Sequence, residues 1–385
     1  MTDDTVTPDP MNASDEVRAR LRADLRHLHP YGAPQLDVPV QLNTNENPYA
    51  PSENLRKAIA DAVAGVAGTL NRYPDRDAVD LRKDLADYLG HGLTAGQVWA
   101  ANGSNEVMLH LLQAFGGPGR TVVSFAPTYS MYPEYARDTH TRWVAGRRND
   151  DFTLDVAHAV EVIEREQPSV ILLTSPNNPT GTALPLDVVE AVLDAAARVH
   201  VPDAPAGAGA VVVVDEAYAE FRREGTPSAL GLLADRPNLA VSRTMSKAFG
   251  AAGMRLGYLA ASTRLVDALR VVRLPYHLSA VTQAAARAAL KHTDELMAQI
   301  GSLRDERDAL VVWLREQGFT VADTDANFVL FGMFADRHAV WQGLLDRGVL
   351  IREVGPAGWL RVSVGTPQET AAFREALTDV QKELR

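Results

Sequence analysis

The chain has 385 residues, of which 46% are hydrophobic and 23% are charged, and its formal net charge is −11. This length predicts one large domain with a smaller one, or two comparable domains, with enough apolar residues for a sizeable core. The negative charge argues against nucleic acid or an anionic membrane as a partner. The sequence contains no cysteine, which excludes disulfides, thiolate catalysis and zinc–thiolate sites, and we predict no bound metal.

The N-terminal segment is acidic and has no apolar run, so it does not read as a signal peptide. No apolar stretch approaches the length of a membrane span. We therefore expect a soluble cytoplasmic protein with a disordered tail up to about residue 13. The spacing of apolar residues predicts a helix over residues 16–28.

After two further predicted helices, the pattern from about residue 97 alternates between strands and helices. Continuous β-branched runs indicate strands that are covered on both faces. The sequence thus predicts an α/β fold, with a mostly parallel mixed sheet between helices and a smaller α+β C-terminal domain. We expect an N-terminal tail and arm over 1–40, a large domain over 41–280, and a small domain over 281–385 that packs with part of the N-terminal segment. Strands are predicted at 97–101, 121–125, 169–173, 210–214, 239–243, 255–260, 319–321, 326–331, 349–352 and 359–364. Helices are predicted at 53–66, 78–89, 106–115, 186–199 and 266–274, and one or two more over 282–316.

Polar clusters follow the C-terminal ends of the predicted strands, which is where ligands bind in open α/β sheets. The segment Asn102-Gly103-Ser104-Asn105-Glu106 lies between a strand and a helix. Such a turn forms an anion site, because free backbone N–H groups and the helix dipole point at it. On sequence alone it is equally a tight connection.

Lys247 lies between hydroxyl and small side chains in the stretch 242–258. Thr244, Ser246 and Arg255 offer two hydroxyls and a forked cation, a set that suits a phosphate dianion. A reactive amine beside a phosphate cradle indicates pyridoxal phosphate held as a Schiff base. A lone lysine between serines is more often a solvated surface residue, so this interpretation depends on the rest of the chain.

Asp215 directly follows four valines. A carboxylate at the end of a buried strand is costly unless a cation or a strong donor meets it. An isolated aspartate there is more often a helix N-cap. With Lys247 one strand later, a pyridinium partner is the better interpretation.

Taken together, the residues resemble the pyridoxal-phosphate-dependent aminotransferases with the aspartate aminotransferase fold, and within them the histidinol-phosphate aminotransferases. The resemblance covers about residues 31–365. Seven motifs carry it in the expected order: Asn45–Pro48, Arg72–Pro74, Asn102–Glu106, Pro127–Tyr129, Ser175–Gly181, Asp215–Tyr218 and Ser246–Tyr258.

The resemblance implies a role for each matching residue. Lys247 would form the Schiff base and carry the proton between Cα and the cofactor, and Asp215 would keep the pyridine nitrogen protonated. Asn178 and Tyr218 would hydrogen-bond the ring's phenolate oxygen, and Tyr129 would stack on the ring. The residues that would hold the cofactor's phosphate are Gly103, Ser104, Thr244, Ser246 and Arg255, and Asn105 would also contact the cofactor.

Tyr73, by the same resemblance, would reach the phosphate of the neighbouring subunit's cofactor, which implies a symmetric homodimer with shared sites. Arg361 and Arg352 would grip the substrate's phosphate or carboxylate, since a guanidinium fork suits both. Tyr31 and Asn47 would complete the substrate pocket. For Arg352 a surface salt bridge is nearly as good an interpretation.

The predicted reaction is transamination between L-histidinol phosphate and 2-oxoglutarate, giving imidazole-acetol phosphate and glutamate in histidine biosynthesis. An aromatic (phenylalanine) aminotransferase and a phosphothreonine decarboxylase remain alternatives, because donor choice depends on pocket shape. A ligand-binding transcription regulator is disfavoured, since only about thirty residues of acidic character precede the matching region.

Overall fold

The computed structural model describes residues 15–384, so the predicted disordered tail lies outside the described residues. The chain divides after Asp37 into two compact units. The described part of the first unit contains helix α1 (Asp15–Arg20) and the 3-10 helix η1 (Ala23–Leu25).

The single helix predicted over residues 16–28 is therefore wrong in its extent, because the chain leaves the helix at Leu21. Val17 remains 49% exposed and η1 has no buried residue. A short helix whose apolar stripe is not packed gains little stability.

Seven strands of the second unit form one sheet, in the spatial order β2-β8-β7-β6-β5-β3-β4. The pairs from β4 to β7 are parallel, and β8 runs antiparallel to both β2 and β7. The prediction of a mostly parallel mixed sheet is confirmed. The strands are β2 (Val98–Ala101), β3 (Thr121–Ala126), β4 (Arg142–Arg147), β5 (Val170–Thr174), β6 (Val211–Asp215), β7 (Leu239–Thr244) and β8 (Gly257–Ala261).

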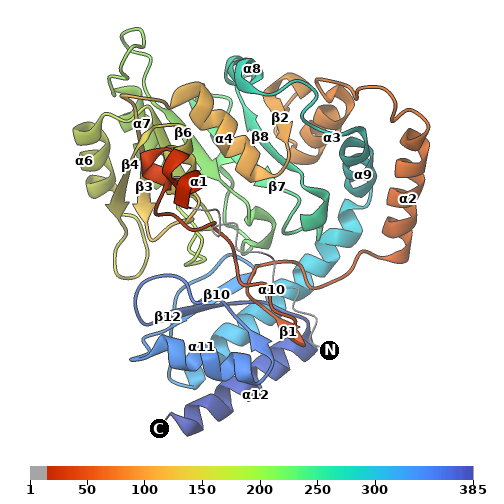
Figure 1. Ribbon diagram of the computed structural model, residues 1–385, viewed down its shortest axis with the longest axis vertical. Coiled ribbons are helices and arrows are strands. Elements are labelled where there is room, and N and C mark those ends of the chain that lie inside the picture. The colour runs from red at the N-terminus through yellow and green to blue at the C-terminus, as the bar shows by residue number, and fades with distance from the viewer. Residues whose placement is uncertain (1–14, 385) are drawn as a thin grey trace. The chain divides into compact units, whose positions relative to one another are not determined.

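Helices cover both faces of this sheet (Figure 1). Val212 and Val214 pack into one hydrophobic cluster, which α3, α6, α7 and α9 complete, whereas Val213 packs into another with α4, α5 and α8. This two-sided burial is why β6 reads as an uninterrupted run of valines. The helices are α2 (Glu53–Ala67), α3 (Val79–Leu89), α4 (Ser104–Phe115), α5 (Tyr132–Asp138), α6 (Val156–Glu166), α7 (Leu186–Ala197), α8 (Thr263–Val272) and α9 (Ala280–Leu290). Short 3-10 helices are η2 (Ala95–Gln97), η3 (Ala219–Phe221), η4 (Ala229–Leu232) and η5 (Ala252–Met254).

Strands β1 (Val40–Gln41) and β4 and helices α5 and α6 were not identified from the sequence. β4 is one of the two edge strands of the sheet and, unlike the fully buried edge strand β2, has arginine at both ends and only Gly146 buried. An edge strand with polar ends lacks the continuous apolar run that identified its neighbours.

The C-terminal part has its own antiparallel sheet, in which β10 (Phe328–Gly332) lies between β9 (Thr320–Val321) and β12 (Trp359–Ser363). Helices α10 (Thr293–Glu316), α11 (Arg337–Asp346) and α12 (Pro367–Glu383) accompany it. The early strand β1 (Val40–Gln41) pairs in parallel with β11 (Val349–Leu350), and Figure 1 shows β1 among these C-terminal elements.

Helix α10 links the two parts of the second unit. Leu296 and Ile300 near its start belong to the core beneath the large sheet, whereas Leu310 and Leu314 near its end pack in the core of the C-terminal sheet. The predicted boundaries at residues 40 and 280 remain predictions. Within the described residues, no helix is both long and apolar enough to span a membrane.

Candidate active site

Lys247 lies just beyond the end of β7, in a position that is partly buried. Its Nζ donates to the main-chain oxygen of Thr44 at 2.8 Å. Burial is the main cause that lowers the pKa of the Lys247 amine to about 8; the positive charges of Arg361 and Arg255 act in the same direction, and Glu46 opposes them. A lysine with this pKa supplies some neutral amine near neutral pH, which is the form that attacks a carbonyl.

Asp215 ends β6, the strand next to β7, and its side chain is only 5% exposed. Tyr132 Oη donates to Asp215 Oδ2 at 3.1 Å, and the Ala217 N–H donates to Oδ1 at 3.2 Å. No ion pair to Asp215 forms among the described residues. Burial raises the pKa of this carboxyl to about 6, against the smaller opposing effect of the two hydrogen bonds. A buried carboxylate in this state is suited to meet a cationic ligand.

Arg255 faces the N-terminus of α4 across a glycine cradle. A Cβ on Gly103, which has φ 86°, would lie 2.4 Å from Arg255 Nη2. A Cβ on Gly257 would lie 2.1 Å from the Ser104 nitrogen, so only glycine allows β8 to pass this close to the start of α4. A guanidinium beside free helix N–H groups forms an anion site. The anion interpretation of residues 102–106 thus has a geometric basis.

Two hydroxyls complete the cradle. Thr244 Oγ1 donates to Ser246 Oγ at 3.0 Å, and Arg255 Nη1 approaches the same Ser246 oxygen at 3.5 Å. The structure therefore brings together the predicted phosphate-binding residues of β7, its following loop and the α4 N-terminus.

A second group surrounds the lysine on the side of the C-terminal sheet. The Lys247 Nζ lies 5.9 Å from the centre of the Tyr218 ring. Arg361 is buried on β12, where Nη1 donates to Asn178 Oδ1 at 2.6 Å and Nη2 donates to the Asn43 carbonyl at 2.7 Å. The guanidinium also lies 5.1 Å from the centre of the Phe328 ring. These contacts place Arg361 beside predicted cofactor ligands rather than on the surface.

Tyr129 and Asn105 meet at the edge of the cradle, where Tyr129 Oη lies 3.4 Å from Asn105 Oδ1. The Tyr129 ring also packs edge-on against Tyr132, with ring centres 5.7 Å apart. Tyr132 in turn donates a hydrogen bond to Asp215. Tyr129, the side chain predicted to stack on the cofactor, therefore packs against a residue that contacts the buried carboxylate.

Asn47 and Arg352 lie close to the site residues but not in the same network. Asn47 Nδ2 donates to the Ala248 carbonyl at 3.2 Å, one residue after the lysine. Arg352 is partly buried and pairs through its main chain with Arg361. This pairing places the two predicted substrate arginines on neighbouring strand positions.

Tyr73 lies apart from the other predicted site residues of the second unit. It is 80% exposed and stacks on Tyr276, with ring centres 4.4 Å apart. Tyr31 belongs to the first compact unit and is half exposed, so its predicted place in the substrate pocket stays a prediction.

Four residues that contact the predicted site had no role assigned from the sequence, although Asn45 lies within the first of the seven motifs. Tyr132 donates to Asp215, and three consecutive residues near β1 contact Arg361, Lys247 and Tyr218 in turn. The three are Asn43, Thr44 and Asn45. The density of amides in residues 43–47 was a usable signal, but the pattern did not identify which side chains they contact. Tyr132 offered no signal, because a tyrosine on a buried helix face resembles any core aromatic residue.

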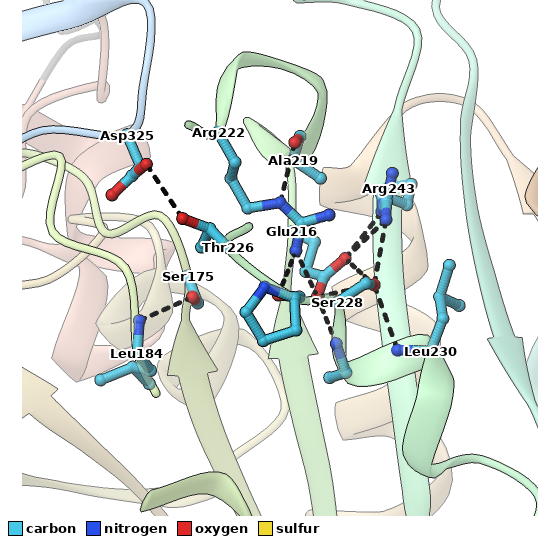
Figure 2. Close-up of polar contacts among 12 residues, drawn as sticks. Ser175, Leu184, Glu216, Ala219, Arg222, Thr226, Ser228, Leu230, Arg243 and Asp325 are labelled. Atoms are coloured by element: carbon cyan, nitrogen blue, oxygen red, sulfur yellow. Dashed lines mark hydrogen bonds and ion pairs between the residues drawn. The ribbon is translucent and has the colours of Figure 1, made fainter. Parts of the chain in front are cut away.

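Behind the strand ends, a buried ion-pair network holds β6 and β7 together (Figure 2). Arg243 Nη2 lies 2.7 Å from Glu216 Oε2, and Arg243 Nη1 lies 2.9 Å from Glu220 Oε1. Ser228 Oγ donates to Glu216 Oε2 at 2.7 Å, and Arg222 Nη1 lies 3.5 Å from Glu216 Oε1. Because Asp215 precedes Glu216 and Lys247 follows β7, this network holds the two strands that carry the site.

Comparisons with known proteins agree with this architecture. The profile of the family "Aminotransferase class I and II" matches residues 38–377. The chain is 63% identical to the histidinol-phosphate aminotransferase of Thermobifida fusca (strain YX), over 93% of this chain and 94% of that protein. It is 56% identical to the histidinol-phosphate aminotransferase of Bifidobacterium longum (strain NCC 2705), over 94% of this chain and 96% of that one.

The fold is also that of a solved structure, the histidinol-phosphate aminotransferase of Sinorhizobium meliloti in complex with pyridoxal-5'-phosphate. The TM-score is 0.78 at 24% sequence identity, covering 90% of this chain and 92% of that one. With a family match over most of its length and relatives above half identity, the chain belongs to the aminotransferase class I and II family.

Proposed function

We propose that the protein is a pyridoxal-phosphate-dependent aminotransferase that transfers the amino group of L-histidinol phosphate to 2-oxoglutarate. One structural observation carries the chemistry. A lysine with a lowered pKa and a buried aspartate, which has no cationic partner among the described residues, lie at the ends of two adjacent parallel strands. The names of the relatives at 63% and 56% identity support the substrate.

The residues present fit the cofactor. The Arg255–Ser246 cradle at the α4 N-terminus suits its phosphate, and Asp215 suits its protonated ring nitrogen. When bound, pyridoxal phosphate supplies an aldehyde that condenses with an amine and a ring that accepts electrons from the substrate's Cα. Asp215, ionised opposite the ring nitrogen, would keep that nitrogen protonated.

Lys247 has two tasks in this proposal. Its neutral amine would hold the cofactor covalently, and the same amine, once released, would serve as the base that accepts the proton from the substrate's Cα. A base with a pKa near 8 both accepts and returns a proton at neutral pH. The Thr44 carbonyl accepts a hydrogen bond from Nζ at 2.8 Å and so orients the free amine.

Arg361 and Arg352 would bind the anionic group of each substrate. Histidinol phosphate offers a phosphate and 2-oxoglutarate offers carboxylates, and a guanidinium fork accepts either. Asn178 and the Asn43 carbonyl hold the Arg361 guanidinium in place before substrate arrives. Asn47 and Tyr31 would contribute to the same pocket.

A symmetric homodimer in the cytoplasm is also part of the proposal. Tyr73 and Tyr276 stack on the surface, and Val271 and Leu274 nearby along the chain are 84% and 74% exposed. Exposed apolar side chains that gather into one patch mark interaction surfaces in soluble proteins, and in this proposal these four side chains belong to such a patch. A second copy seated there would bring Tyr73 to the partner's cofactor phosphate, as its position in the resemblance implies.

The test combines a spectrum with a donor panel. Purified protein with pyridoxal phosphate should show a visible absorption band, and the Lys247→Ala variant should lose both that band and turnover, with kcat falling by at least about 10²- to 10⁴-fold. With 2-oxoglutarate as acceptor, kcat/KM should be highest for histidinol phosphate among histidinol phosphate, phenylalanine and phosphothreonine. A Lys247→Ala protein with full turnover would remove the lysine assignment. Faster turnover of phenylalanine, or loss of carbon dioxide from phosphothreonine, would replace the proposed substrate.

A further inference from the structure

The segment after β1 touches the site with three residues in succession. The Asn43 carbonyl accepts from Arg361, the Thr44 carbonyl accepts from Lys247, and the Asn45 side chain reaches Tyr218. Two of these contacts use the main chain, so substitution leaves them in place. The third depends on the side chain of Asn45.

Asn45 is 1% exposed and is held from several directions. Its φ of 55° lies in the left-handed region, which asparagine tolerates better than most residues. Asn327 Nδ2 donates to its carbonyl oxygen at 3.0 Å. The main-chain N–H of Asn45 donates to Ser363 Oγ at 2.9 Å, and Ser363 Oγ lies 3.0 Å from Asn45 Oδ1.

These contacts determine which way the Asn45 amide faces. Ser363 Oγ accepts from the Asn45 N–H and donates its own hydroxyl proton to Asn45 Oδ1. With Oδ1 turned to Ser363, Nδ2 faces Tyr218 and donates to Tyr218 Oη at 3.0 Å. An amide turned the other way would bring an oxygen to Tyr218 and lose the bond from Ser363.

The direction of this hydrogen bond matters because Tyr218 has a single proton to donate. A phenol that accepts from Asn45 must direct its own O–H bond elsewhere. Tyr218 is 5% exposed, and its ring centre lies 5.9 Å from Lys247 Nζ. In the proposed function, the side of Tyr218 toward the lysine is where the cofactor's ring oxygen would lie.

We propose that Asn45 is a positioning residue, which fixes the Tyr218 hydroxyl as a hydrogen-bond donor to the ring oxygen of the bound cofactor. The inference rests on the proposed function, since it assigns Tyr218 to that oxygen. Ser363, which orients the Asn45 amide, lies on strand β12 two residues after Arg361. A change on this strand would therefore alter, through Asn45 and Tyr218, how tightly the link between Lys247 and the cofactor binds a proton. A donor to the negatively charged ring oxygen disfavours protonation at that link, so losing the donor raises the pKa of the bound chromophore.

The test is a double-mutant cycle on the holoenzyme. The measured quantity is the pKa of the bound cofactor, read from the pH dependence of its visible absorption without substrate. Tyr218→Phe should raise this pKa by about one to two units, because a hydrogen bond to a charged group is worth about 1.5–3 kcal/mol and one unit corresponds to 1.36 kcal/mol. Asn45→Ala should raise it by about one unit, and the same change in the Tyr218→Phe background should add nothing.

A further variant keeps the inference testable if Asn45→Ala does not fold, and another serves as its control. Ser363→Ala removes the hydroxyl that orients the amide, and should raise the pKa by less than Asn45→Ala but in the same direction. The matched control is Ser242→Ala on β7, a buried serine whose hydroxyl makes no hydrogen bond among the described residues. That variant should leave the pKa unchanged.

The outcomes separate this inference from the proposed function. A shift with Tyr218→Phe but none with Asn45→Ala or Ser363→Ala would overturn the positioning role while leaving Tyr218 in place. Equal shifts from Asn45→Ala in both backgrounds would also overturn it, since Asn45 would then not act through the hydroxyl. No shift with Tyr218→Phe would overturn the role of Tyr218 in the proposed function, and this inference with it.

Discussion

Asp215 and Glu216 are neighbours in sequence, both are buried, and they lie in opposite electrostatic environments. Glu216 is 1% exposed and is surrounded by Arg243, Arg222, the Ser228 hydroxyl and the Ala229 N–H. Asp215 is 5% exposed and receives two neutral donors, the Tyr132 hydroxyl and the Ala217 N–H. Figure 2 shows the first environment, with Glu216 at the centre of the dashed contacts.

The presence or absence of cationic partners suggests a structural role for the Glu216 carboxylate and a ligand-binding role for that of Asp215. A buried charge with its cations supplied by the chain holds the fold together, and little is left for a ligand to improve. A buried charge without a cation is unfavourable until one arrives, and binding that cation recovers the missing interaction. The contrast at the end of β6 therefore favours Asp215, rather than Glu216, as the carboxylate that would bind a cationic ring in the proposed function.

The largest expected effect is on folding, at Glu216. Glu216→Gln removes the charge that Arg243 and Arg222 share, and breaking a buried ion pair costs about 3–5 kcal/mol. The free energy of unfolding from urea titration should fall by that amount, while turnover per folded molecule changes little. Asp61→Asn, which breaks the exposed Lys57–Asp61 pair, is the matched control and should have little effect. Equal losses from the two variants would show that the Glu216 network contributes no more than a surface pair.

The next effect is on catalysis, at Asp215. Asp215→Asn keeps the side chain's size but removes the fixed negative charge opposite the ring nitrogen. Removing one preorganised electrostatic partner costs about 10²- to 10³-fold in kcat. The measurement is kcat for histidinol phosphate, with cofactor content determined for each preparation. If the asparagine variant kept wild-type kcat, the contrast between the two carboxylates would have no functional meaning.

The smallest effect is a pH dependence of stability in the protein freed of cofactor. Burial raises the pKa of Asp215 from an ordinary 3.8 to about 6, so the folded protein binds this proton more tightly than the unfolded chain does. The Asp215 contribution to the free energy of unfolding is thus most favourable below about pH 4 and falls as the pH rises to about 6, by on the order of 3 kcal/mol.

The measurement compares urea unfolding of the cofactor-free wild type and Asp215→Asn between about pH 4 and 7.5. The stability advantage of the variant should grow through this window and then level off. A difference between the two proteins that stays constant with pH would show that Asp215 is not destabilised by burial.

Much of the large sheet was predictable from the sequence. The valines of β6 and the apolar runs of β5 and β7 are continuous because helices cover both faces, and that burial leaves a pattern in the chain. β4 was missed because it is mostly exposed and carries no continuous apolar run, unlike the other edge strand, β2. The helix over residues 16–28 was overextended because periodicity does not reveal whether an apolar stripe packs against anything.

Within the site, what was predictable was the chemistry of each strand end. Asp215 was predicted because a carboxylate at the end of a buried strand is costly unless a cation or a strong donor meets it. Lys247 and Arg255 were predicted because an amine beside hydroxyls and a guanidinium suits a bound phosphate and a Schiff base. The partners of Tyr132 and of the Asn43–Asn45 segment were not predicted, since they lie tens or hundreds of positions away along the chain.

The sequence by itself determined the class of fold and most of the strands of the large sheet, and it predicted the polar groups at their ends, because burial and backbone geometry act locally and leave periodic patterns. Only the tertiary structure decided which of two adjacent carboxylates has cationic partners, and which way the Asn45 amide faces. Both depend on donors and charges that distant segments bring within hydrogen-bonding distance, and no local pattern records them.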